Sequence, residues 1–146
     1  MADDKKMGMG FGVMILKEGK ILLGKRHDDP EKASSLMHGE GTWTMPGGKL
    51  HFGEQFEEAC AREALEETSI KINPSDLTLI SVSNDIVPTA HFLTLGFLCE
   101  KFSGEPKVME PDEITDWQWF FLDKLPEKVF PPSQKVLDNY FAKRIY

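Results

Sequence analysis

The chain has 146 residues, a formal net charge of −7 at pH 7 and an isoelectric point near 5.1. Its length fits a single domain over residues 1–146. Hydrophobic residues make up 40% of the chain and include ten Phe and three Trp, which excludes a disordered chain. No apolar run approaches the roughly 18 residues of a membrane span, and the acidic balance argues against long nucleic acid as a partner, so we expect a small-molecule partner and no membrane.

The N-terminal part of the chain predicts a β-hairpin followed by a long loop. Residues 1–12 lack a long apolar stretch behind a basic one, so we expect no secretory signal and a cytoplasmic location. Residues 10–26 hold two apolar runs joined by a Lys-Glu-Gly-Lys turn, which is typical of a hairpin. Residues 27–41 are polar and contain Gly and Pro, which indicates a loop of the kind that binds ligands.

The middle of the chain predicts a short strand, a helix and further strands. The strand at 42–45 runs into Pro46-Gly47-Gly48, and an amphipathic helix is expected to start at Glu54. Three later segments alternate or run apolar, as half-buried or central strands do: residues 77–83, 91–100 and 116–122. Cys60 in the helix and Cys99 in a strand lack CxxC spacing, which favours buried free thiols over a disulfide or a zinc site.

A final helix completes the predicted elements. Pro131-Pro132-Ser133 opens it, and Ser133 is expected to be its N-cap. Apolar residues then recur at helical spacing: Val136, Leu137, Tyr140 and Phe141. Because there is no internal repeat, linker or low-complexity tract, the elements together predict one mixed α/β domain.

The helix after Glu54 gathers carboxylates on one side. At about 100° per residue, Glu63, Glu66 and Glu67 fall within an arc of about 100°. The mostly opposite face is small and apolar: Cys60, Ala61, Ala64 and Leu65. The like charges repel, and Arg62, which the helix places nearest Glu58 and Glu66, neutralises only one. Mg²⁺ suits a site with a few carboxylates, water and a substrate phosphate; the alternative is a solvated, glutamate-rich surface.

These residues resemble the signature of the Nudix hydrolase superfamily. The signature reads Gly, five residues, Glu, seven residues, Arg-Glu-aliphatic-any-Glu-Glu-any-Gly-aliphatic. Here it covers 23 residues, as Gly48, Glu54, Arg62, Glu63, Ala64, Glu66, Glu67, Ser69 and Ile70. Two positions depart from this signature. Ala64 is small for the aliphatic position, and Ser69 replaces the glycine. The replacement at Ser69 affects the end of the helix more than metal binding.

The resemblance implies a fold and a metal site. The fold is an α/β/α sandwich with a mixed β-sheet between helices. Glu63 and Glu67 would ligate Mg²⁺, or Mn²⁺ in its place, Glu66 would ligate the metal or orient water, and Gly48 would contribute its carbonyl. Glu113, in the acidic loop before a Trp-rich strand, would bring a further acid to the metal, with a solvated loop acid as the alternative. Either Glu63 or Glu66 would accept the proton of the attacking water.

The resemblance also implies residues for bracing and for substrate binding. Arg62 and Glu54 would pair and hold the loop to the helix. Arg26 and Lys49 would contact the substrate phosphate or sugar, with an ordinary surface role as the alternative for each. Thr44 would touch the base from the pocket floor.

Other conspicuous side chains are given no catalytic role. Trp117 and Trp119 alternate onto one face of a strand, where core packing is the main interpretation and stacking on a base the alternative. The histidines show no metal-ligand spacing: His27, His38, His51 and His91.

The implied activity is metal-dependent hydrolysis of a phosphoanhydride in a nucleoside diphosphate linked to another group. The segment PGGKLHFGE, with the later EPDE and WQW, looks most like the MutT-type branch, which cleaves nucleoside triphosphates to monophosphate and pyrophosphate. ADP-ribose or another nucleotide sugar is the alternative. Ile86 occupies the position of the proline that marks ADP-ribose as substrate, but Pro88 lies close by and keeps this alternative open.

Four further alternatives remain at this level. The tyrosine that marks dinucleoside polyphosphates is absent from the same position, and the acidic surface disfavours RNA ends. A nucleotide-binding sensor without hydrolytic activity is an alternative of another class, against which the complete set of Glu63, Glu66 and Glu67 speaks. An isomerase of the same fold is more remote. Many relatives are homodimers, so the resemblance allows a homodimer.

Overall fold

The computed structural model describes residues 5–33, 37 and 39–146. Within these, the elements in chain order are β1 (Lys6–Lys17), β2 (Lys20–Arg26), β3 (Trp43–Thr44), β4 (Gly47–Lys49), α1 (Phe56–Thr68), the 3₁₀ helix η1 (Pro74–Asp76), β5 (Leu77–Val87), β6 (Ala90–Cys99), β7 (Ile114–Phe121) and α2 (Pro131–Ala142). Expectations for residues 1–4, for part of the loop 27–41 and for His38 lie outside the described residues.

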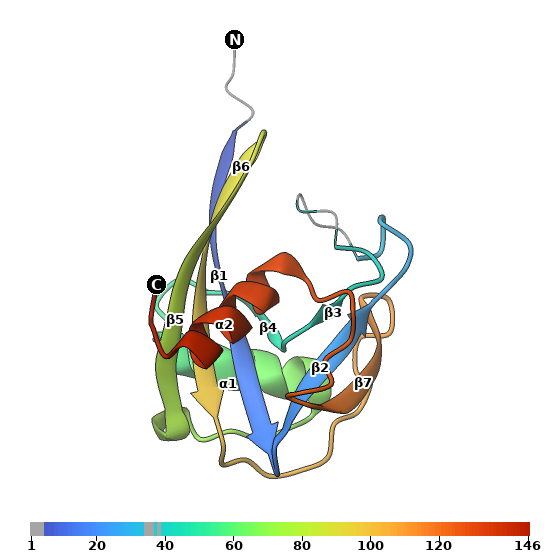
Figure 1. Cartoon of the computed structure of the whole chain (residues 1–146), viewed down its shortest axis with the longest axis vertical. Helices are drawn as coiled ribbons and strands as arrows, with labels where there is room; N and C mark the ends of the chain where they lie inside the picture. The colour runs from blue at the N-terminus through green and yellow to red at the C-terminus, as the bar shows by residue number, and fades with distance from the viewer. Residues whose placement is uncertain (1–4, 34–36, 38) are drawn as a thin grey trace.

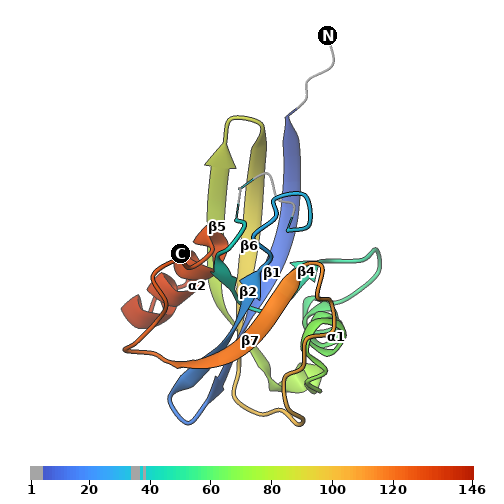
Figure 2. The ribbon, with the colours of Figure 1, turned by 90° about the vertical axis from the view of Figure 1, so that its right-hand side faces the viewer.

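The described strands form one mixed sheet in which β3, β2, β1, β6 and β5 lie side by side, while β4 pairs with β1 and β7 with β2. β1 and β6 run parallel, and the other pairs are antiparallel, including the predicted hairpin of β1 and β2. Helix α1 covers one face and α2 the other, as Figures 1 and 2 show from two sides. The predicted α/β/α sandwich is confirmed.

Successive side chains of β1 point to opposite faces of the sheet, and the core accordingly has two layers. Phe11, Val13 and Ile15 belong to the cluster that includes Cys60 of α1. Met14, the next residue on the other face, belongs to the cluster that includes Val136 and Leu137 of α2. Each fully buried aliphatic side chain stabilises the fold by about 1.5–3 kcal/mol relative to leaving it in water. The two layers therefore fix both helices to the sheet.

Cysteine and tryptophan side chains lie where the sequence predicts them. Cys60 and Cys99 are buried free thiols. Trp117 is buried in the cluster on the side of α1, and Trp119 packs against the same cluster. Trp119 also stacks on Phe102 with ring centroids 5.8 Å apart. The core-packing interpretation of the two tryptophans is confirmed.

Helix α1 begins at Phe56, two residues later than expected, with Gln55 at the N-cap position. Glu54 stays outside the helix because its carboxylate has other partners. Its Oε1 accepts the backbone N–H of His51 at 2.7 Å, and its Oε2 accepts Nε–H of Arg62 at 2.7 Å.

The buried face of α1 also differs from the expectation. Cys60, Ala64, Glu67 and Thr68 are buried, at the i, i+4, i+7 and i+8 spacing of one helical stripe. Leu65, which we expected to pack, is exposed because it falls beside this stripe. Glu67 therefore faces the sheet and not the solvent.

Helix α2 corrects the predicted N-cap. Phe130 holds the N-cap position and Pro131-Pro132 fills the first helical positions, so Ser133 lies inside the first turn. Proline suits these positions because its missing N–H needs no partner there. The Ser133 hydroxyl instead accepts the backbone N–H of Met45 at 3.0 Å and shares a hydrogen bond with the Thr44 hydroxyl at 3.2 Å.

Ser69 ends α1 although it replaces a glycine of the signature. It adopts φ 65° in the left-handed region, and its N–H donates to the Leu65 carbonyl at 3.0 Å. Glycine adopts this conformation without steric cost, so the serine holds it under strain. In the part of the chain that the structure describes, no helix is both long and apolar enough to cross a membrane.

Candidate active site

A cavity of about 390 Å³ opens between the start of α2, the adjoining face of β1 and β6, and the loop after β2. Gly10 and Gly12 of β1 lie in its lining, and without side chains they leave the space open. Gly10 pairs with Thr94 of β6, which also lines the cavity. The strands β1 and β6 thus provide one wall of the cavity.

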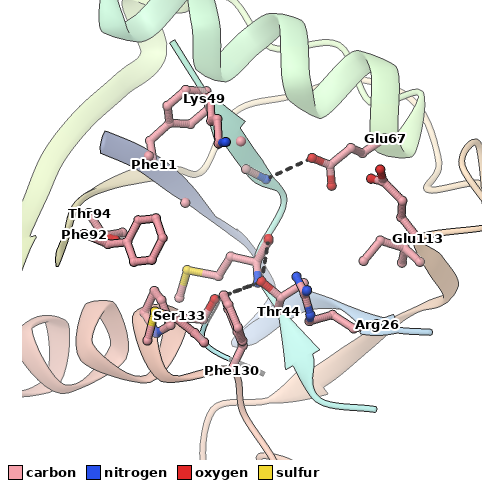
Figure 3. A pocket seen from close by; sticks show the side chains of 18 of the residues that line it. Phe11, Arg26, Thr44, Lys49, Glu67, Phe92, Thr94, Glu113, Phe130 and Ser133 are labelled. Carbon is pink, nitrogen blue, oxygen red and sulfur yellow. Dashed lines mark hydrogen bonds between the residues drawn. The ribbon is translucent and has the colours of Figure 1, made fainter. Parts of the chain in front are cut away.

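The two sides of the cavity differ in chemistry. Figure 3 shows Phe92 and Thr94 on one side, and Glu67, Glu113 and Arg26 on the other. An apolar wall facing a few charged groups is the usual form of a small-molecule site. The arrangement suits a ligand with an apolar part against Phe92, and an anionic part beside Glu67 and Glu113 would need a cation held by these acids.

Glu67 is the most buried acid of the site, with 9% of its surface exposed. Its Oε1 accepts the backbone N–H of Gly47 at 3.4 Å. Burial raises the pKa of Glu67 well above its usual range, and the charge of Glu63, a hydrogen bond with Glu63 and the charge of Glu110 add to the effect. Burial likewise raises the pKa of Glu110, as do the charges of Glu113, Glu63 and Glu66. These acids therefore form one repelling cluster.

Arg62 is the cation within this cluster. Its Nε and Nη2 donate to the two carboxylate oxygens of Glu54 at 2.7 and 3.0 Å, which confirms their expected pairing. Its Nη1 donates to Glu63 at 3.0 Å and to Glu66 at 3.2 Å, and Nη2 also donates to the Lys49 carbonyl at 3.0 Å. The guanidinium holds the loop 49–54 to α1, and the hydrogen bond from Arg62 lowers the pKa of Glu54 to about 2.

Gly47 and Gly48 allow the backbone to approach the acids closely. A Cβ on Gly48 would lie 2.5 Å from the carboxyl carbon of Glu63, and a Cβ on Gly47 would collide with the Phe11 carbonyl oxygen. Only glycine leaves this space, so β4 lies directly against Glu63.

The donor chemistry of the cluster fits a hard divalent cation. Glu67 is buried beside Glu63, and Arg62 pairs with Glu63 but has no described contact with Glu67, because its contacts go to Glu54, Glu63 and Glu66. Among the described residues, no three His, Cys, Asp or Glu side chains converge closely enough to hold a metal as they stand. Two of the expected ligands, Glu63 and Glu66, instead contact Arg62, and the metal-ligand set remains a prediction.

Arg26 lines the cavity but has partners of its own. Its Nε donates to the Gly39 carbonyl at 3.0 Å and its Nη2 to the Ala33 carbonyl at 2.8 Å. The guanidinium lies 4.5 Å from the ring centroid of Phe130. Burial lowers the pKa of Arg26, against the opposing charge of Glu113. Arg26 therefore connects the loop after β2 to the start of α2, and its role in substrate binding stays a prediction.

Most of the expected site residues meet at this cavity. Its lining includes Arg26, Thr44, Gly48, Lys49, Glu67 and Glu113. Glu63 lies against Gly48, with 16% of its side chain exposed. Glu66 differs, since 50% of its side chain is exposed and its described contact is with Arg62.

Sequence reasoning missed several residues of the lining. Phe92 and Phe130 form aromatic walls, Lys32 adds a cation, and Ser133 and Val136 reach the cavity from α2. The strand pattern gave no sign that Phe92 faces a cavity. The helical spacing of Val136 was recognised, but it indicated only packing.

A family model described as "NUDIX domain" matches residues 6–140. The chain is 32% identical over 127 residues to a protein of Methanocaldococcus jannaschii named ADP-ribose pyrophosphatase, covering 87% of this chain and 69% of that protein. It is 35% identical over 134 residues to a Pseudomonas aeruginosa protein named NAD-capped RNA hydrolase NudC. That match covers 88% of this chain but 45% of the relative, so the chain spans less than half the length of this relative.

A solved structure gives the same result. The crystal structure of a MutT NUDIX hydrolase from Burkholderia pseudomallei matches with a TM-score of 0.79 and 35% identity, over 91% of this chain and 97% of that chain. The similarity therefore extends over nearly the whole of both chains.

Proposed function

The chain belongs to the NUDIX domain family, and from that premise we propose that it hydrolyses nucleoside triphosphates to nucleoside monophosphate and pyrophosphate. Family membership makes it a hydrolase of pyrophosphate bonds. The finer proposal is carried by the cavity, which offers an aromatic and apolar wall at Phe92 and a cluster of acids around Glu67. Its similarity to a MutT NUDIX hydrolase over nearly the whole of both chains supports the same substrate class.

The proposed cofactor is Mg²⁺, with Mn²⁺ as a substitute. Glu63, Glu66, Glu67 and Glu113, with the carbonyl of Gly48, would hold it. When bound, such an ion neutralises phosphate charge and lowers the pKa of a bound water. The repulsion around Glu67 supports this assignment, because a cation there would stabilise the ionised acids.

The residues of the chain then have separate tasks. Phe92 and Thr44 contact the base, and Arg26 and Lys49 bind the phosphates. A carboxylate, Glu63 or Glu66, takes a proton from water as the water oxygen bonds to phosphorus. The P–O bond of the anhydride between the first and second phosphates breaks, and its electron pair stays on the bridging oxygen of the leaving phosphate. Arg62, held by Glu54, keeps the acids in position.

The test is a product analysis with the full chain. Each nucleoside triphosphate is incubated with MgCl₂, MnCl₂ or EDTA, and the products are separated by ion-exchange chromatography. We expect monophosphate and pyrophosphate in a one-to-one ratio with either metal and none with EDTA. Release of inorganic phosphate in place of pyrophosphate would contradict the proposal. Nucleotide binding without turnover would favour a sensor.

ADP-ribose or another nucleotide sugar is the second candidate. The observation in its favour is the 32% identity to the Methanocaldococcus jannaschii protein named ADP-ribose pyrophosphatase. Including ADP-ribose in the same assay separates the two, because its hydrolysis gives AMP and ribose 5-phosphate. A kcat/KM for ADP-ribose at least tenfold above that of every triphosphate would replace the first proposal by the second.

Partners, location and assembly stay predictions. We propose a small nucleotide as the partner, in preference to long nucleic acid, on the basis of the net charge of −7. The relatives named NAD-capped RNA hydrolase are the reason to include a capped RNA in the substrate screen. A cytoplasmic location and a homodimer are untested.

A further inference from the structure

A turn in the loop after β2 is fixed by hydrogen bonds at both of its ends. At its start, the backbone N–H of Asp29 donates to Nδ1 of His27 at 3.0 Å. The Asp29 carbonyl then accepts the N–H groups of Lys32 and Ala33, each at 3.0 Å. At the end of the turn, the Ala33 carbonyl accepts Nη2–H of Arg26 at 2.8 Å, and Ala33 is buried. The backbone that carries Lys32 therefore has a defined position.

This turn brings a lysine to the cavity. Lys32 is one of the lining residues, together with its neighbour Ala33. Its Nζ lies 3.7 Å from Oδ1 of Asp112, and the two side chains are 48% and 88% exposed. Ion pairs between side chains as exposed as these contribute little to stability, because water screens both charges. An anion that enters the cavity can therefore compete with Asp112 for the ammonium group of Lys32.

The ammonium group of Lys32 lies on the acidic side of the cavity. Its partner Asp112 precedes Glu113 in the turn 110–113, and Glu113 lines the cavity. Figure 3 shows Glu113 on the side opposite Phe92. When the base of a nucleotide lies against Phe92, its phosphates extend toward the side of Glu113 and Lys32.

We propose that Lys32 binds the terminal phosphates of a nucleoside triphosphate. This inference rests on the proposed function, since it concerns the phosphates of the same substrate. A lysine ammonium carries a full charge and three hydrogen-bond donors on a flexible stem. A terminal phosphate carries a charge of about −1.5 to −2 at pH 7, so it is a stronger partner for the ammonium than the exposed carboxylate of Asp112.

The assignment makes Lys32 a specificity-determining residue. In ADP-ribose the second phosphate bears a ribose, so no doubly charged terminal phosphate follows it. A nucleoside monophosphate ends at the first phosphate and does not extend to Lys32. The loss of Lys32 should therefore weaken the binding of a triphosphate and affect the other two ligands much less.

The test is calorimetric binding of two ligands to the full chain in MgCl₂. One is the analogue of a nucleoside triphosphate in which a methylene group replaces the oxygen between the first and second phosphates, so that the reaction cannot cleave it. The other is the monophosphate of the same nucleoside. Lys32→Ala should weaken binding of the analogue by about fivefold or more and binding of the monophosphate by less than about twofold, because a hydrogen bond to a charged group is lost. Lys32→Arg keeps the charge and should restore binding of the analogue to within about threefold of wild type.

Asp112→Asn is the matched control. It removes the same ion pair as Lys32→Ala but leaves the ammonium group in place. If Lys32 binds phosphate, this variant should bind the analogue as tightly as wild type or more tightly. If Lys32 serves the ion pair alone, the two variants should lose affinity equally.

Three results would overturn the inference alone. The first is a folded Lys32→Ala variant that binds the analogue as wild type does. The second is an equal loss of affinity for the analogue and the monophosphate in that variant. The third is an equal loss in Lys32→Ala and Asp112→Asn. A wild-type protein that neither binds the analogue nor cleaves a triphosphate would instead overturn the proposed function, and the inference with it, so the two failures are distinguishable.

Discussion

The substitution Glu67→Gln should separate stability from activity. Burial and the charge of Glu63 raise the pKa of Glu67, so without a metal the ionised carboxylate destabilises the folded protein. Glutamine has the same shape, keeps an acceptor for the N–H of Gly47 and removes the charge. We therefore expect the variant to be more stable than wild type in metal-free buffer, although it should lose the reaction.

The sign of the effect follows from the direction in which the pKa of Glu67 is shifted. The unfolded carboxyl titrates near pH 4.3, roughly the reference value. Above that pH the folded protein retains a proton that the unfolded chain releases, so stability falls as pH rises up to the folded-state pKa of Glu67. Each pH unit of that window costs about 1.4 kcal/mol. Glu67→Gln avoids this cost, so its advantage in stability over wild type should grow with pH across the window and stay constant above it.

The assay is thermal unfolding of wild type and Glu67→Gln in EDTA from pH 4 to pH 8, followed by a titration with MgCl₂. Wild type should lose stability as pH rises, and the variant should lose less. Magnesium should stabilise wild type by about 2.7 kcal/mol at a hundred times its Kd and the variant by much less. Turnover of the variant should fall at least about a hundredfold. A variant that is less stable in EDTA yet retains turnover would refute this reasoning.

Three further substitutions or treatments test other contacts. Gly48→Ala places a Cβ 2.5 Å from the Glu63 carboxyl carbon, so turnover should fall about a hundredfold, and unchanged steady-state rates would contradict that contact. Ser69→Gly should raise the unfolding free energy by about 0.5–1 kcal/mol in denaturant titrations, because φ 65° strains serine. A loss of stability in this variant would contradict the strain at Ser69. Burial raises the pKa of Cys60 to about 12 and of Cys99 to about 11, so native protein at pH 8 should react with a thiol reagent only as fast as it unfolds.

Local patterns in the sequence predicted the parts of the fold that local physics determines. The hairpin of β1 and β2 follows from two apolar runs and a turn, and the helix α1 from its periodicity. The position of Ser133 was wrong because its hydroxyl bonds to Met45, 88 residues away in sequence. No local rule reports such a partner.

The residues of the site likewise differ in whether the sequence alone could reveal them. The acids of α1 were recognisable because their spacing is fixed within one segment. Phe92 and Phe130 come to the cavity from β6 and from the residue before α2, and only the assembled sheet brings them near Glu67. An aromatic residue in an apolar strand looks the same in sequence whether it faces a core or a cavity.

Arg62 shows how the charge of this site is distributed. On the helix alone it lies nearest Glu58 and Glu66, but its shortest contact is with Glu54 at 2.7 Å, outside α1. One guanidinium thus serves the loop and the outer acids, and its described contacts do not include Glu67. The repulsion that remains is concentrated where Glu67 faces the cavity, which is also where a substrate phosphate would arrive. A cation that binds there relieves the repulsion and attracts the phosphate at once, so metal affinity and substrate affinity should rise together.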